Sequence, residues 1–528
     1  MGQLSRCISP ATLFMLSVNA ILGSGWLFAP LYAAKIAGPA ALVSWVIGGL
    51  AAILIAFTFA ELSAMLPVAG GTAQIPQLSH GGLVSFILSW IGWLSMLMLT
   101  TVEVQAVLQY AALFFPFLMH DVNGAQVLTL WGLLWAAILL LTLCIVNVLS
   151  CRGLSRINFA LFIFKVFVIV LMIFSITRIR FNPHNFAGIG TSMVSVQGWQ
   201  TILTAVAAGG VAFAFNGFKN GVEMAGEAKN LAVAIPLSTA GSVMACMLLY
   251  LGLQVCFIGA LDPASMQQGW QHLKFAGDVG PFAGLAAGLG LLWLVKLLYV
   301  DAVISPSGAG LIYVTGTARV LYAMSQIGYV PAFLSRLNRQ RLPMYAIFVN
   351  FLCGLFTFLP LPGWQAMANF LVSILVITYA MGPIALLSLR QTLPDKPRPF
   401  RLPMANILCV LAFYCCNLFS YWTGWDSISK LLMALSIGLM VFGIAYLRGN
   451  INMEKDEIKS GAWFIPYIIG LVVISYLGSF GGKNIIPFGW DFAVIALFSI
   501  GILYLAVGSR MSTLIISEPE PAVAVEYS

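Results

Sequence analysis

The sequence predicts an all-α polytopic membrane protein with about fourteen spans, and three observations carry this prediction. Hydrophobic residues make up 61% of the 528 residues and charged residues only 8%, whereas soluble chains carry about 25% charged residues. Apolar runs of about 20 residues, long enough to cross a bilayer as a helix, recur along nearly the whole chain. Two of these runs are interrupted by glycine, and the first of them contains AILGSGWLFAP (20–30).

The apolar runs define the expected spans in chain order. We place them at 10–36, 39–65, 83–115, 126–148, 157–177, 199–226, 234–259, 291–320, 344–361, 366–389, 402–423, 427–447, 461–480 and 489–508. The polar intervals between them are all of loop size, so no soluble domain is expected. We expect a ten-span core over 1–390, spans eleven and twelve over 391–450, spans thirteen and fourteen over 451–510, and a cytoplasmic tail over 511–528.

The distribution of lysine and arginine predicts the orientation, because cytoplasmic loops of membrane proteins are enriched in both. With the N-terminus in the cytoplasm, sixteen basic residues fall on the cytoplasmic side, five on the outer side and four inside spans. Both termini are therefore expected in the cytoplasm. The formal net charge of +8 follows mainly from this bias and requires no nucleic-acid partner.

Spans one and six are both interrupted, at Gly23-Ser24-Gly25 and at Phe215-Asn216-Gly217. Glycine inside a helix costs about 0.5–1 kcal/mol relative to alanine, and freed N–H and C=O groups find no water in lipid. Interrupted helices at corresponding positions of two halves indicate an inverted-repeat secondary transporter. We therefore expect two five-span halves of opposite orientation, although the halves show no sequence similarity.

The interruptions also predict a binding site. Unwinding at 23–25 frees the N–H groups of a half-helix that starts near Trp26, and a helix N-terminus suits a carboxylate. Carbonyl groups at the end of the preceding half-helix, and at Phe215 and Asn216, suit an ammonium group. Backbone groups alone would then hold both ends of an α-amino acid.

Four segments resemble the amino acid–polyamine–organocation family of permeases: ILGSGWLFAP (21–30), AELSAMLPVAGG (60–71), FAFNGFKNGVEMAGEAKN (213–230) and ARVLYAMSQIGYVP (318–331). DAVISPSGAG (301–310) and the fourteen-span layout are similar to the branch that contains bacterial aspartate–proton symporters. The resemblance covers the ten-span core. It implies a secondary active amino acid transporter of the bacterial inner membrane, working by alternating access. Proton symport and amino acid exchange both remain open.

The resemblance implies that 23–25 hold the substrate carboxylate and that Phe215 is a gate over the substrate. Lys219 departs from the family pattern, because members that carry cations often have an acid at this position. This reversed charge favours an acidic or neutral substrate, with aspartate or glutamate first. The expected substrate-binding residues are Ile21, Gly23, Ser24, Gly25, Phe215, Asn216 and Lys219.

Ionisable residues inside spans suggest function, because each costs about 2.5–3.5 kcal/mol at the bilayer centre on insertion scales. Lys165 lies halfway along span five. In some proton-coupled members of the family a lysine here replaces a bound sodium ion, so the resemblance makes Lys165 the candidate proton carrier. The alternative is a lysine that only pins neighbouring spans together. Asp301 in span eight is expected to pair with Lys165, to move protons or to contact the substrate.

Three further polar residues are secondary candidates. Glu103 in span three either has a structural role, as a helix cap or on bound water, or contacts the substrate. Glu223 follows Lys219 by one helical turn, so the two charges could satisfy each other. Ser305 follows Asp301 by one turn and could supply a hydroxyl to the same region.

A membrane-embedded enzyme is the rival class. Such enzymes use paired acids or His/Asp clusters at helix ends, and the sequence shows neither pattern. The four histidines are not at metal-ligand spacing, so neither a metal nor a cofactor is expected. The expected partners are an amino acid, protons and the lipid bilayer.

Overall fold

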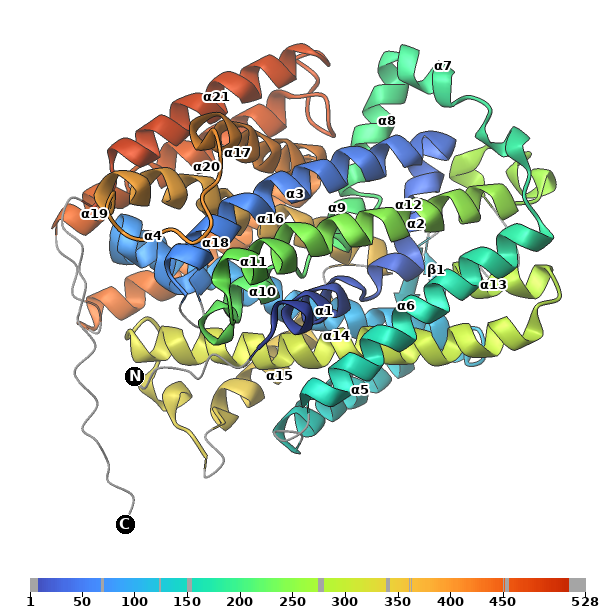
Figure 1. Cartoon of the computed structure of the whole chain (residues 1–528), viewed down its shortest axis with the longest axis horizontal. Coiled ribbons are helices and arrows are strands. Elements are labelled where there is room, and N and C mark those ends of the chain that lie inside the picture. The colour runs from blue at the N-terminus through green and yellow to red at the C-terminus, as the bar shows by residue number, and fades with distance from the viewer. Residues whose placement is uncertain are drawn as a thin grey trace.

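The structure is a computed structural model and describes residues 8–67, 71–122, 125–149, 154–273, 280–338, 342–359, 361, 363–449, 451 and 455–511. The long helices run roughly along one direction (Figure 1). The hairpin of β1 (Met119–Val122) and β2 (Ala125–Leu128) lies at one end of this bundle, and α1 (Pro10–Ile21) begins at the other. These ends are called the hairpin end and the α1 end below.

The described elements follow in chain order. The first half holds α1, α2 (Gly25–Ala37), α3 (Ala41–Met65), α4 (Gly71–Ala111), the hairpin, α5 (Leu130–Leu149) and α6 (Leu154–Ile179). The second half holds α7 (Ile189–Val194), α8 (Val196–Ala207), α9 (Val211–Ala214), α10 (Lys219–Glu223), α11 (Leu231–Pro236), α12 (Ser242–Ala260), α13 (Pro281–Gly288), α14 (Leu292–Gln326), α15 (Met344–Thr357) and α16 (Gly363–Thr392). The remaining helices are α17 (Ala405–Trp422), α18 (Trp425–Leu447), α19 (Lys455–Gly461), α20 (Phe464–Leu477) and α21 (Trp490–Gly508).

The expected all-α membrane fold is confirmed. Among the described residues, eleven helical stretches are long and apolar enough to cross a membrane, with α2 and α3 counted as one. They supply spans two to five, seven, eight and ten to fourteen. Span one is divided between α1 and α2, span six is divided among α8, α9 and α10, and span nine is the 14-residue α15.

Two expected boundaries are wrong. Span three was expected at 83–115, but α4 begins at Gly71 and bends at Gly81, whose φ of 75° suits glycine. The first part of α4 contains polar and glycine residues before position 83, so it does not form an apolar run in the sequence. Span four was expected from 126, but 125–128 form β2, whose apolar residues merged with the run that follows. Of the expected tail 511–528, all but Met511 lies outside the described residues.

The central helix of the bundle is α16. Every residue from Phe370 to Leu389 is buried, as expected for a helix that is apolar on all sides. It packs against α3, α4, α17 and α18. By contrast, α5 and α6 are largely exposed along their apolar length, which is the pattern of helices that face lipid. The buried helices therefore surround α16 and the two broken spans.

The C-terminal spans dock on the bend of α4. The Ser460 hydroxyl donates to the carbonyl oxygen of His80, and the backbone N–H of Gly82 donates to Glu457 Oε2 at 3.2 Å. From the end of α21, the carbonyl oxygen of Ala506 lies 2.9 Å from His80 Nε2. The first two bonds satisfy backbone groups beside the bend at Gly81, and the third joins the His80 ring to α21.

A buried carboxylate ties three segments together at the α1 end. Glu61, near the C-terminus of α3, is fully buried. It lies 2.6 Å from Arg390 Nη2 and 3.3 Å from Arg398 Nε, and it accepts a 2.6 Å hydrogen bond from the backbone N–H of Leu402. This cluster joins α3, the end of α16 and the segment that leads into α17.

Replacing this carboxylate tests its contribution. Glu61→Ala leaves two arginines without their buried partner, and breaking a buried ion pair costs about 3–5 kcal/mol. We expect a clear fall in the thermal unfolding midpoint of the detergent-purified protein. Asp426→Ala is the control, because its pair with Lys430 leaves the Asp426 side chain 80% exposed and such pairs are worth less than about 1 kcal/mol. Equal shifts for both variants would contradict this account.

Candidate functional site

The first span breaks where the sequence predicts it. α1 ends at Ile21 and α2 begins at Gly25, so the backbone between them has left the regular helical hydrogen-bond ladder. Within the break, the N–H of Gly23 donates to the carbonyl oxygen of Ile21 at 2.9 Å. Ser24, fully buried, is the residue that precedes the first turn of α2.

Two buried charged side chains hold the two sides of this break. Lys165 Nζ, from α6, donates to the carbonyl oxygens of Asn19 at 3.2 Å and Leu22 at 2.9 Å. Glu103 Oε2, from α4, accepts a 2.8 Å hydrogen bond from the backbone N–H of Ser24. An ammonium group therefore meets the C-terminal end of α1 and a carboxyl group meets the N-terminal end of α2, the ends at which a helix dipole favours positive and negative charge.

The two glycines of the break face different neighbours. A Cβ atom at Gly23 would lie 2.5 Å from Glu103 Oε1, so the absence of a side chain makes room for that carboxylate. A Cβ atom at Gly25 would lie 2.9 Å from the Cα atom of Ala214. Gly23 thus borders the anion position, whereas Gly25 allows α2 to touch the backbone of span six.

The second break is also where the sequence predicts it and lies against the first. α9 ends at Ala214 and α10 begins at Lys219. Gly217, with φ of 116°, is so close to the first span that a Cβ atom would lie 2.8 Å from the backbone of Ile21. An additional interruption, not predicted, separates α8 from α9 at Gly210, whose φ is 81°.

Tyr250 of α12 bridges the two breaks. Its buried hydroxyl lies 3.1 Å from the carbonyl oxygen of Ile21 and 2.9 Å from that of Ala214. The carbonyl of Ile21, expected for a substrate ammonium, therefore has a protein partner in this conformation. Tyr250 is not among the residues predicted from the sequence, although a tyrosine inside an apolar span has a hydroxyl that needs a buried partner.

The expected gate residue, Phe215, packs against α3 and α12. The Phe215 ring packs edge-on against Trp45 and Tyr250, at centroid distances of 5.6 and 5.4 Å. Phe213, two residues earlier, instead contacts Trp364 edge-on at 5.3 Å. Phe213 and Phe215 therefore have different ring neighbours, and a gating role for Phe215 stays a prediction.

A cluster of aromatic rings closes the site toward the hairpin end. Fully buried Trp364 packs against Phe28, Tyr32 and Phe213 at centroid distances of 5.2, 5.7 and 5.3 Å. Its indole N–H donates to Ser24 Oγ at 2.9 Å. Beyond this cluster, a polar vestibule of about 1050 Å³ lies at the hairpin end.

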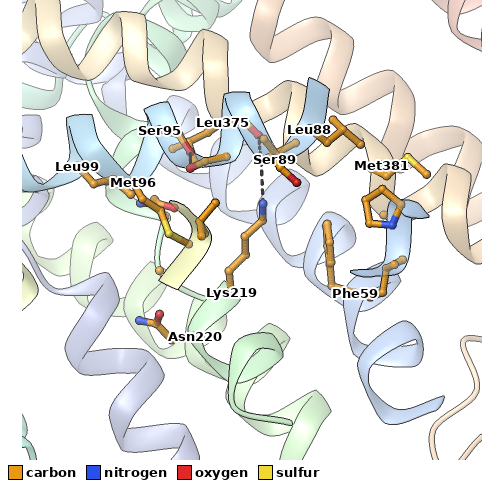
Figure 2. Close-up of a pocket in the computed structure, with 18 of the residues that line it drawn as sticks. Phe59, Leu88, Ser89, Ser95, Met96, Leu99, Lys219, Asn220, Leu375 and Met381 are labelled. Carbon is orange, nitrogen blue, oxygen red and sulfur yellow. Dashed lines mark hydrogen bonds between the residues drawn. The ribbon is translucent and has the colours of Figure 1, made fainter. Parts of the chain in front are cut away.

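A small cavity lies on the other side of the breaks, toward the α1 end (Figure 2). Residues of α3, α4, α10, α14 and α16 line it, together with Asn216 and Gly217 of the second break. Its volume is about 60 Å³, far below the 300–1,000 Å³ of typical ligand pockets. Tyr313, whose hydroxyl donates to the carbonyl oxygen of Ala20 at 3.2 Å, also borders it. The space beside the two breaks is therefore filled mostly by side chains.

Lys219 is the cation of this cavity. Figure 2 shows it extending from α10, and its Nζ donates to Thr378 Oγ1 at 2.7 Å. The same ammonium lies 4.4 Å from the ring centroid of Tyr379, a cation–π distance. The described hydrogen bond of Lys219 is thus with Thr378 of α16. Glu223 is half-buried and lies one turn further along α10.

Two amide groups beside Lys219 have unused donors. The Tyr379 hydroxyl donates to Asn216 Oδ1 at 2.6 Å, which leaves Nδ2 of buried Asn216 to donate elsewhere. Among the described residues, neither Asn216 Nδ2 nor Asn220 Nδ2 has a hydrogen-bond partner. Because buried donors are normally satisfied, these two amides and Lys219 form a set of groups suited to an acceptor that enters the cavity.

Asp301 does not form the expected ion pair with Lys165. Its two carboxylate oxygens lie 2.9 and 3.0 Å from Ser305 Oγ, one turn along α14. No ion pair within 4 Å joins Asp301 to Lys165 in the described structure, because the ammonium is turned toward the carbonyls of α1. Ser305 is thus a partner of Asp301, and a role in proton movement stays a prediction for both.

Residues 8–473 match the amino acid permease family. The chain belongs to that family. It is similar to the glutamate/serine transporter AimA of Bacillus subtilis, with 37% identity over 97% of this chain and 95% of the relative. It is also similar to the aspartate-proton symporter of Bacillus subtilis, with 32% identity over 96% of both chains.

A solved structure supports the fold of this permease. A mutant of the Eremococcus coleocola manganese transporter superposes with a TM-score of 0.53 at 13% identity, covering 92% of this chain and 95% of that one. This likeness concerns the fold alone. Together with the family match, it establishes a multi-pass membrane permease for amino acids and excludes the membrane-embedded enzyme class.

The contact between the two breaks can be tested at Gly25. In Gly25→Val, the side chain would push α2 away from the backbone of Ala214, so we expect uptake of labelled amino acids to be lost while the protein still inserts. Gly443→Val is the matched control, because a Cβ atom there has no heavy atom within 4 Å. Normal uptake by the Gly25 variant would show that the breaks need not touch.

Proposed function

We propose that this permease is a proton-coupled symporter of acidic amino acids, with aspartate or glutamate first, that works by alternating access. The observation that carries this proposal is the set of donors at the cavity, Lys219 with the amides of Asn216 and Asn220. The names of two relatives, a glutamate/serine transporter and an aspartate-proton symporter, agree with this substrate class.

The substrate is placed by its two charged ends. Its α-carboxylate binds the backbone N–H groups at the start of α2, around Ser24, and its ammonium binds carbonyl groups at the end of α1 and at Phe215. Its side-chain carboxylate then extends toward Lys219. Charge-assisted hydrogen bonds of this kind are worth about 1.5–3 kcal/mol each. A neutral amino acid such as serine would make the backbone contacts but leave Lys219 unused.

Lys165 is proposed as the proton carrier. An ammonium group has three donors and no acceptor, and two of these donors hold the carbonyls of Asn19 and Leu22. Loss of the proton would remove the positive charge that suits the end of α1. It would also weaken the hydrogen bonds by which Lys165 of α6 holds the first break. The protonation state of Lys165 is thereby linked to the geometry of the break, and Asp301 is the nearby acid proposed to share in proton movement.

The α1 end is proposed to face the cytoplasm of a bacterial cell. The basic residues Arg390 and Arg398 lie at this end, and the positive-inside rule places such residues in the cytoplasm. The small cavity then opens toward the inside, and the polar vestibule lies outside. The protein would reside in the inner membrane, with both termini cytoplasmic.

The charge of residue 219 tests the substrate class. In Lys219→Glu, the side-chain carboxylate of aspartate would meet a like charge, so aspartate binding should weaken far more than alanine binding. Competition against a labelled substrate in proteoliposomes measures both affinities. Lys430→Glu is the control, because Lys430 pairs on the surface with Asp426. If arginine or lysine were the best competitor of the unmutated protein, the proposed substrate class would be wrong.

The proton-carrier role is tested at residue 165. Lys165→Ala should abolish the acceleration of uptake by an inward proton gradient, because no ammonium remains to hold Asn19 and Leu22. Uptake by proteoliposomes with and without an imposed pH gradient measures the effect and also separates symport from exchange. Lys296→Ala is the control, since Lys296 is exposed on α14. Full gradient-driven accumulation by Lys165→Ala would leave Lys165 only a pinning role.

A further inference from the structure

Glu103 occupies the position proposed for the substrate carboxylate. Its Oε2 atom accepts the backbone N–H of Ser24 at 2.8 Å, at the N-terminal end of the 13-residue α2. We propose that Glu103 is an internal stand-in for the substrate: it binds the break while the carrier is empty, and it takes up a proton and yields this position when an amino acid binds. This inference rests on the proposed function and adds to it the order of events at the break.

The position of Glu103 is built into the packing. Its side chain is 2% exposed, and glycines on two other segments leave it space. A Cβ atom at Gly23 would lie 2.5 Å from Oε1, and one at Gly310 of α14 would lie 3.8 Å from the Cβ atom of Glu103. A side chain at Gly23 would crowd the carboxylate away from Ser24, whereas a Cβ atom at Gly310 would be in ordinary contact with Glu103. The three segments thus accommodate a carboxylate at this point rather than a water-filled gap.

Two carboxylates cannot share this position while both are charged. Like charges in a buried site disfavour each other's ionised form, so one of them must bind a proton. The α-ammonium group of the same molecule and the backbone N–H groups at the start of α2 keep the substrate carboxylate ionised. Glu103 is therefore the carboxylate that becomes neutral. The proton comes from water on the side from which the substrate enters. Binding of one amino acid is then accompanied by uptake of one proton at Glu103, in addition to the proton movement proposed for Lys165.

The charged and titratable groups around Glu103 are compatible with this exchange. Lys165 on α6, Tyr250 on α12 and Tyr313 on α14 lie close enough to interact with its charge, and Asp301 on α14 interacts with Lys165. The Lys165 ammonium is bonded to the carbonyls of Asn19 and Leu22 and forms no ion pair with Glu103 within 4 Å among the described residues. Glu103 can therefore leave Ser24 without breaking an ion pair.

The stand-in also explains how an empty carrier can close. Without Glu103 or a substrate, the start of α2 would leave a buried N–H group and a helix dipole unsatisfied. With Glu103 bound, the break stays satisfied while the protein changes its facing direction. A symporter must return empty, whereas an exchanger returns only with a substrate, so this side chain favours net transport over exchange.

The test compares the unmutated protein with Glu103→Gln, which keeps the shape but cannot change charge. In the unmutated protein, the dissociation constant for labelled aspartate should rise by about tenfold per pH unit above the titration of Glu103. Binding in weakly buffered solution should take up about one proton per substrate. Glu103→Gln should bind with little dependence on pH, take up no proton, and retain exchange while losing accumulation driven by a pH gradient.

Controls separate this inference from the proposed function. Asp426→Asn removes a surface carboxylate and should keep the pH profile of the unmutated protein. Glu103→Asp, which is one methylene too short to reach Ser24, should bind aspartate more tightly than the unmutated protein at alkaline pH. The inference fails if the unmutated protein takes up no proton on binding, or if Glu103→Gln keeps the original profile. If neither acidic nor neutral amino acids bind the unmutated protein, the proposed function fails instead.

Discussion

A backbone break inside a membrane is tolerable only if every freed N–H and C=O group finds a partner, because lipid offers none. In this permease the break between Ile21 and Gly25 meets that requirement with two buried charges. Lys165 holds the carbonyl side and Glu103 holds the amide side. The arrangement of spans three and five around span one follows from this requirement, since those two spans carry the two side chains.

The second break depends on the first. Gly217 brings span six against the backbone of Ile21, and Tyr250 connects the carbonyls of Ile21 and Ala214. A substrate that uses these backbone groups must therefore replace protein side chains rather than enter an empty pocket. Substrate binding then competes with the side chains that already bind the backbone of the breaks. These side chains lie on spans three, five and seven, so binding is linked to movements of those spans. The aromatic cluster around Trp364 closes the same region toward the hairpin end.

The C-terminal spans are attached to this core by hydrogen bonds to α4. Ser460, Glu457 and Ala506 bind the bend of α4 at residues 80–82. The segment just before this bend contributes Ile75 and Pro76 to the lining of the small cavity. The outer helices thus hold in place one wall of the cavity at the α1 end. Helix α21 also packs against α16 and α17, so the outer helices meet the core at more than one place.

The sequence by itself determined the membrane class, the number of spans and the positions of both breaks. These features are local: an apolar run of sufficient length, and glycine within it, have the same meaning wherever they lie in a fold. It also singled out Lys165, Lys219 and Glu103, because an ionisable residue inside a span is conspicuous in any membrane protein.

Only the tertiary structure decided which partners these residues have. Glu103 and Ser24 are 79 positions apart, and no local pattern reveals that one caps the other. The hydrogen bond of Asp301 with Ser305 and the different ring neighbours of Phe213 and Phe215 depend on which way each side chain points. That direction is set by packing between spans, which a sequence of nearly uniform hydrophobicity does not encode locally. The groups that fill the site were therefore visible in the sequence as candidates, and the long-range contacts between spans determine which partners they have.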